Sequence, residues 1–178
     1  MTKARAVPAP PECALAPLYA GADLLDAYAT LLPEGASGDI AVLARAVLAE
    51  QAGWVRGLMR VRDGVMRPFG VKTSKAIGRA AEARREGHIG FFPVRGRSEH
   101  ELIVGEDDRH LDFRASVLLR DAADGAGREL VATTVVHCPN RLGRVYLRVI
   151  GPFHRAIVRG NLDRAARRGW PAGGGDPI

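Results

Sequence analysis

Four consecutive segments with alternating apolar and polar residues constrain this chain most, because a long segment with helical periodicity follows them directly. The four segments are residues 88–96, 100–106, 109–121 and 128–138. A period of two is typical of strands that bury one face, and short connections between consecutive strands favour antiparallel pairing. The sequence therefore predicts an antiparallel sheet.

The segment after these strands predicts one long helix. Asn140 can serve as its N-cap, and the helix should extend to about Arg168, which gives a length of roughly 40 Å. Pro152 follows Gly151 and should kink it. Its apolar face is predicted to carry Leu142, Val145, Tyr146, Val149, Ile150, Phe153, Ile157 and Leu162.

The part before the sheet divides into an arm, a strand and helices. Four prolines in residues 1–22 predict an arm, which would either wrap the domain or be disordered, and residues 23–32 predict a first strand. Asp39 is a good N-cap for a helix that ends near Gly53. The remaining expectations are a second helix over residues 54–67 and a surface loop or short helix over residues 71–87.

Composition favours a single α+β domain in the cytoplasm. With 178 residues, 47% of them apolar, the chain can bury one core, expected over residues 23–168 with a flexible tail at 169–178. Two cysteines provide no disulfide framework, and neither a signal peptide nor a membrane span is evident. The net charge of +6 comes with abundant Ala and Arg, a bias that often reflects genomic base composition, so no nucleic-acid partner is predicted.

Three stretches carry a resemblance to a known family: GFFPV, GEDDRHLDFRASV and TTVVHCPNRLGRVYLRVIGPFHRAIV. There the chain resembles the bacterial domain-of-unknown-function family two-eight-six-seven, which is placed among the START-like (SRPBCC) helix-grip proteins. The resemblance covers roughly residues 23–164. It implies a curved antiparallel sheet that grips a long carboxy-terminal helix, with a cavity between them, and it implies no particular reaction.

The densest polar cluster, residues 106–114, supplies most of the candidate site. Strand alternation places Asp107 and Arg109 on the cavity side and His110 and Asp112 on the other side, unless a bulge reverses them. An exposed ion pair of Asp112 with Arg114 is the simpler interpretation. The catalytic candidates are Asp107, His110, Asp112, His137 and Tyr146, and the ligand-binding candidates are Arg109, Arg114, Asn140, Arg141, Ile150 and Phe153.

Three further patterns are weaker. Asp108, His110, Asp112 and His137 have the residue types of a metal site, but their pattern is not specific and no metal is predicted. The amino terminus of the last helix could attract an anionic ligand group. An arginine row on that helix (Arg141, Arg144, Arg148, Arg155 and Arg159) is interpreted as a solvated face, and His154 as a partly exposed, hydrogen-bonded residue.

These patterns lead to one leading hypothesis and two alternatives. The leading one is a domain that binds a mainly apolar small metabolite, resembling a polyketide, lipid or aromatic compound, and that could catalyse cofactor-independent cyclisation, isomerisation or dehydration. No cofactor is expected, because the chain lacks a glycine-rich nucleotide loop and a GxSxG elbow. The alternatives are a noncatalytic carrier or sensor, and an interaction protein using the basic helix face. A homodimer is compatible with all three.

Overall fold

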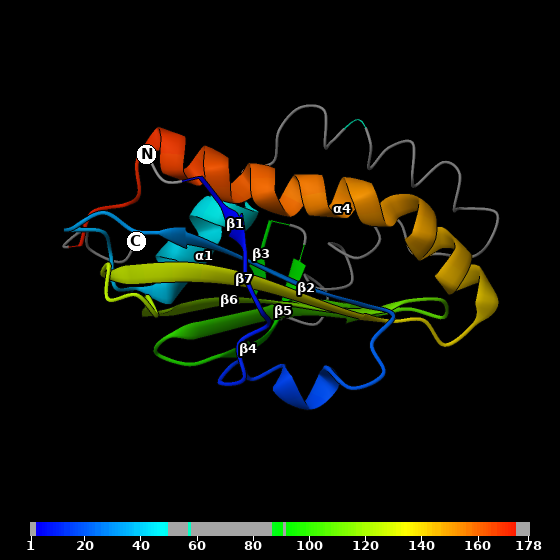
Figure 1. Cartoon of the computed structure of the whole chain (residues 1–178). Helices are drawn as coiled ribbons and strands as arrows, with labels where there is room; N and C mark the ends of the chain where they lie inside the picture. Colours follow the sequence, from blue (N-terminus) through cyan, green and yellow to red (C-terminus); the bar gives the residue numbers. More distant parts are fainter. Residues whose placement is uncertain (1–2, 50–56, 58–86, 91, 174–178) are drawn as a thin grey trace.

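A single antiparallel sheet organises the computed structural model, which describes residues 3–49, 57, 87–90 and 92–173. Within these residues the sheet has seven strands in the order β1-β2-β7-β6-β5-β4-β3. Figure 1 shows the helices on one side of this sheet and the short blue helix of the amino-terminal arm on the other. The strands are β1 (Arg5–Ala6), β2 (Leu24–Leu31), β3 (His88–Ile89), β4 (Phe92–Arg97), β5 (Glu101–Asp107), β6 (Asp112–Asp121) and β7 (Arg128–His137).

The register of β2 against β7 joins the first long strand to the last. Asp26 lies opposite Thr134 and Tyr28 opposite Ala132, so alternate residues of both strands face the helices. The predicted first strand and the predicted antiparallel sheet are both confirmed. The segment at 88–96 is divided, because Gly90 takes a φ of +62° between β3 and β4, a conformation that favours glycine.

Helix α1 (Ile40–Leu48) packs on the inner face of the sheet, as its pattern predicted. The Asp39 side chain accepts a hydrogen bond from the Ala41 amide and caps it. Ile40, Leu43 and Val47 are buried in the main core with Leu130. Apart from Gly57, the predicted second helix and the predicted loop before Gly87 lie outside the described residues.

Helix α4 (Arg141–Arg168) crosses the same face of the sheet and completes a helix-grip fold. The Asn140 side chain accepts a hydrogen bond from the Gly143 amide, so the predicted cap and length are confirmed. Figure 1 shows α4 bending towards the sheet in its amino-terminal half. No helix among the described residues is long and apolar enough to cross a membrane.

The predicted apolar face of α4 is wrong in its amino-terminal half. The residues buried there are Gly143, Leu147 and Gly151, whereas Val145, Val149 and Phe153 are 57%, 64% and 49% exposed. The physical reason is close approach at the start of the helix: Gly143 lies against the His110 carbonyl, so Gly143, Leu147 and Gly151 face inwards and Val145, Val149 and Phe153 face outwards.

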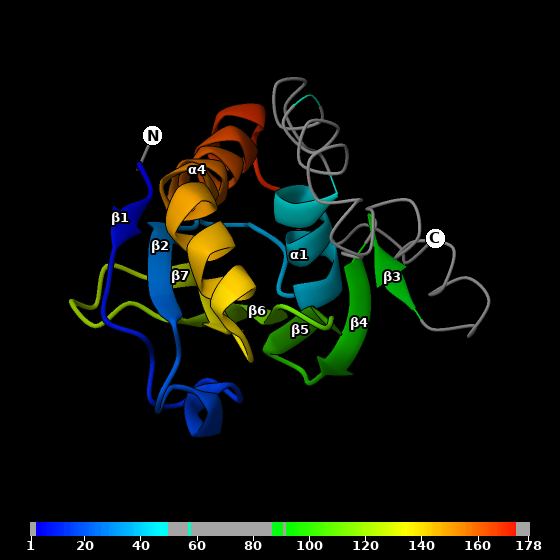
Figure 2. The same ribbon diagram turned by 90° about the vertical axis from the view of Figure 1, so that its right-hand side faces the viewer.

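The arm begins beside α4, where the Ala4 amide donates to Asp163, and its later part lies on the outer face of the sheet. β1 pairs with β2, and the short 3-10 helix η1 (Ala16–Leu18) follows. Cys13 and Leu15 are buried in a second apolar cluster together with Leu118 and Val131. Figure 2 shows the three layers in order, with η1 below the sheet and the two helices above it.

Candidate site between β2 and α4

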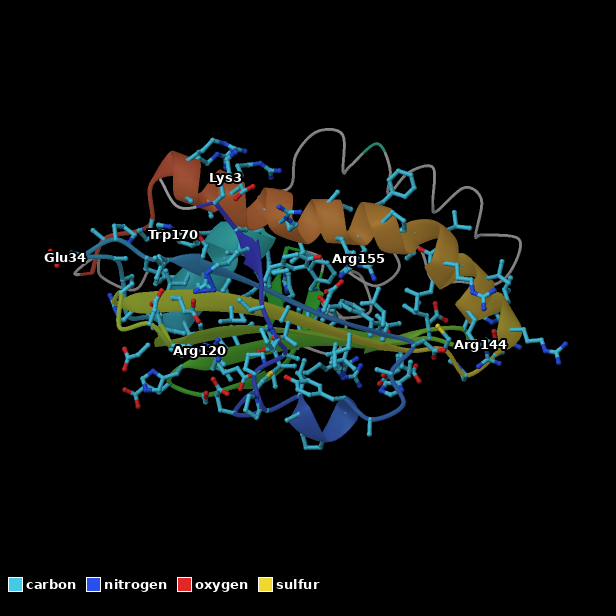
Figure 3. All side chains as sticks on the ribbon, viewed as in Figure 1. Lys3, Glu34, Arg120, Arg144, Arg155 and Trp170 are labelled. Carbon is cyan, nitrogen blue, oxygen red and sulfur yellow. The ribbon has the colours of Figure 1, made fainter. Side chains whose placement is uncertain are left out.

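A groove of about 380 Å³ lies where the start of β2 meets the amino-terminal half of α4. Three arginines of α4, Arg144, Arg148 and Arg155, contribute to its walls. The other lining residues are Asp23, Leu24, Leu147, Gly151 and Pro152. Figure 3 shows Arg144 near the amino-terminal end of α4 and Arg155 between the helix and the sheet. The groove therefore combines apolar walls with concentrated positive charge.

Beside the groove, a carboxylate and an imidazole face each other. Asp26 Oδ1 lies 3.6 Å from His154 Nε2, and Asp26 Oδ2 lies 3.7 Å from Arg155 Nε. These distances exceed those of normal hydrogen bonds. No described residue hydrogen-bonds to either Asp26 oxygen or to His154 Nε2, although all three atoms are buried. Arg155 connects the two features, because it also lines the groove.

Buried polar atoms without partners are rare in folded proteins. Leaving one such atom unsatisfied costs about 1–3 kcal/mol, so each instance needs a reason. Asp26 and His154 lie close together and next to a groove, and carboxylate and imidazole are common general acids and bases. The pair thus combines the group types of acid–base chemistry, although neither residue lines the groove.

Tyr28 extends this polar cluster along β2. Burial, and then the nearby Asp26 carboxylate, raise the pKa of the Tyr28 phenol above its ordinary value. The guanidinium of Arg159 lies 5.9 Å from the centre of the Tyr28 ring, a cation–π contact. The phenol is therefore held in its neutral form, which can donate a hydrogen bond.

The acidic cluster at residues 106–112 forms the end of a hairpin rather than a cavity wall. Asp107 lies opposite Asp112, and residues 108–111 turn the chain. The predicted cavity-side position of Asp107 is therefore wrong: it lies on the outer face, where Arg114 Nη1 is 2.7 Å from its Oδ1. Arg114 forms an ion pair, as predicted, but its partner is Asp107 and not Asp112.

His110 and Asn140 tie the hairpin turn to the start of α4. The Asn140 amide nitrogen donates to the Arg109 carbonyl at 2.7 Å and lies 2.8 Å from His110 Nδ1. The Asn140 oxygen also caps the helix, so both polar atoms of this side-chain amide have structural partners. Arg109 and Arg141 are exposed.

The other predicted site residues are dispersed. His137 Nε2 lies 2.9 Å from the Leu18 carbonyl oxygen on the arm side of the sheet. Tyr146 is half-buried on α4, Ile150 packs against the apolar cluster of Leu147, and Phe153 faces outwards. Among the described residues no group of three or more His, Cys, Asp or Glu side chains could hold a metal ion.

The comparison with protein families gives one match. The family model described as "Protein of unknown function (DUF2867)" matches residues 18–161. The chain belongs to this family. The matched region of DUF2867 includes Asp26, His154 and every residue that lines the groove. Neither the curated proteins nor the solved structures provided a match.

Sequence reasoning missed Asp26 and misjudged His154. The available signal was in β2, where Leu24, Asp26 and Tyr28 alternate towards the helix and only the middle one is charged. A charged residue at an inward position of a strand is costly and therefore informative. His154 was expected to be hydrogen-bonded, but its Nε2 has no such partner among the described residues.

Proposed function

We propose that the protein binds a small organic anion with an apolar part in the groove between β2 and α4. The observation that carries the proposal is the three arginines lining one groove with Leu24 and Leu147. A volume of about 380 Å³ lies in the range of pockets for small metabolites. We therefore expect a ligand that has an anionic group in addition to the apolar part predicted from the sequence.

Arg148 is the arginine best suited to hold that group. No ion pair or hydrogen bond joins its side chain to another described residue, whereas Arg144 Nη1 donates to the Cys138 carbonyl and Arg155 is close to Asp26. A guanidinium binds carboxylate and phosphate groups through two parallel hydrogen bonds. Leu24 and Leu147 would then contact the apolar part of the ligand.

Binding can be tested with octanoate as an apolar carboxylate probe, using isothermal titration calorimetry. Arg148→Ala should weaken octanoate binding about tenfold or more, because a charge-assisted hydrogen bond to the carboxylate is lost. Arg109→Ala is the matched control, since Arg109 is exposed and outside the groove. Equal binding by the two variants would contradict the proposal.

A second candidate function is proton transfer on the bound anion, favoured by the contact of Asp26 with His154. One of these groups would remove a proton from the ligand while the other donates one, which is the chemistry of isomerisation or dehydration without a cofactor. A noncatalytic carrier would use the same groove and leave the ligand unchanged.

Native mass spectrometry of the purified protein separates the two candidates. A compound that is released on denaturation and is unchanged by Asp26→Asn would support a carrier. Accumulation of a different compound in Asp26→Asn would support catalysis. An empty groove in all variants, together with no octanoate binding, would contradict both.

A further inference from the structure

The outer face of α4 has an apolar row that nothing in the described chain covers. Val145, Val149 and Phe153 follow one another at intervals of four residues and point away from the sheet. Pro152 and Ala156 are also exposed and continue the row. Figure 2 shows no described element over the amino-terminal half of α4. Five large apolar side chains are notably exposed among the described residues, and three of them lie here.

Arginines run along one edge of this apolar row. Arg141, Arg148, Arg155 and Arg159 are exposed, and Arg144 lies on the same edge. The helix has no acidic residue before Asp163, so its first 22 residues carry five positive side chains and no negative one. The described surface of α4 is therefore both apolar and strongly basic.

From this combination we infer that the outer face of α4 binds the surface of an anionic lipid bilayer. An interfacial helix places its apolar row at the boundary of headgroups and acyl chains while its arginines contact anionic headgroups. Nucleic acid would satisfy the arginines but would not cover two valines and a phenylalanine. A second copy would cover the apolar row but would oppose one set of five arginines with another.

The membrane surface shares Pro152 and three arginines, Arg144, Arg148 and Arg155, with the groove, so the two proposals are separated by substitutions at positions outside the groove. Val149 and Phe153 do not line the groove, and neither do Arg141 and Arg159. Substitutions at these four positions therefore test the outer face while leaving Arg148 available for the small anion.

Flotation of the full chain with vesicles tests the inference. Phosphatidylcholine vesicles that contain phosphatidylserine should bind the protein, and pure phosphatidylcholine vesicles should bind it much more weakly. The double variant V149S/F153S should lower binding about tenfold or more, because two apolar contacts with the bilayer are lost. The matched control is L18S/L25S, since Leu18 and Leu25 are 40% and 39% exposed elsewhere on the surface.

Charge is tested with R141Q/R159Q, which should lower binding to the anionic vesicles about fivefold for each arginine removed. Added salt should weaken binding of the unchanged protein in the same direction. Circular dichroism of each variant establishes that α4 is intact.

Three outcomes would overturn the inference. Equal losses in V149S/F153S and L18S/L25S would show a nonspecific effect of exposed apolar side chains. A dimer in sedimentation that V149S/F153S dissociates, without vesicle binding, would assign the face to a second copy. Binding to polyglutamate but not to anionic vesicles, lost in V149S/F153S, would assign it to an acidic protein.

Discussion

The carbonyl oxygen of His110 lies against the Cα atom of Gly143, in the space that a β-carbon at position 143 would occupy. This contact joins the turn after β5 to the first turn of α4, and the Asn140 side chain reinforces it. The start of the long helix is therefore fixed by a glycine and an amide rather than by a large apolar side chain.

Gly143→Ala should therefore destabilise the protein although alanine is the better helix former. The new methyl group would overlap a backbone atom, and we expect the free energy of unfolding to fall by about 1–3 kcal/mol in urea denaturation. Gly160→Ala is the matched control on the same helix, because a β-carbon there meets no atom within 4 Å. That control should gain about 0.5–1 kcal/mol; equal effects at both positions would contradict the close approach.

The contact of His110 with Gly143 also illustrates why only part of the fold could be predicted from the sequence. Strand alternation, the caps at Asp39 and Asn140 and the length of α4 are local properties, and they were predictable. The face of α4 was not, because the rule that large apolar residues point inwards fails where glycines allow a helix to approach a turn. The position of the His110 carbonyl against Gly143 depends on tertiary packing.

The candidate site was less predictable than the fold for a related reason. The polar pattern predicted a site that includes Asp107, Asp112 and His137. These three residues lie on the outer face of the sheet, on the adjacent strands β5, β6 and β7. Asp26 and His154 come from opposite ends of the chain, and no pattern in the sequence brings them together. The two strands of the hairpin are adjacent in sequence, whereas the site depends on the long-range pairing of β2 with β7.

Glu129 anchors the arm and should be important for stability. It is buried on the outer side of the sheet, with one oxygen 2.8 Å from Arg5 Nη2 and the other 2.9 Å from Arg120 Nε. Glu129→Gln replaces an acceptor oxygen by a donor facing these arginines, and we expect a loss of about 2–3 kcal/mol in the free energy of unfolding.

The exposed partner of the same network provides the control for that experiment. Glu12 contacts Arg120 at 2.6 Å, and its side chain is 48% exposed. Glu12→Gln should therefore cost less than about 1 kcal/mol. A cost at Glu129 as small as that at Glu12 would mean that the arm does not depend on the buried carboxylate.

Asp26 should lower the stability of the folded protein. Its oxygens are buried without hydrogen-bond partners among the described residues, and its neighbours on the same face are Leu24 and Tyr28. Burying a polar group without hydrogen bonds costs about 1–3 kcal/mol, and an apolar residue of similar size avoids this cost. Asp26→Leu should thus raise the midpoint of urea denaturation. A large loss of stability would instead make Asp26 a structural partner of Arg155.

Cys138 should make stability depend on pH in the alkaline range. Burial, and then the nearby Asp23 carboxylate, raise the pKa of the Cys138 thiol from 9.0 to about 11. The folded state therefore holds a proton that the unfolded state releases. This contribution is fully present below about pH 9 and is lost as the pH rises towards about 11, with a total of roughly 2–3 kcal/mol.

Urea denaturation across this range should show a steeper decline of the free energy of unfolding for the unchanged protein than for Cys138→Ala. Parallel declines would mean that the thiol titrates alike in both states, and rapid alkylation of folded Cys138 by iodoacetamide near pH 9 would lead to the same conclusion.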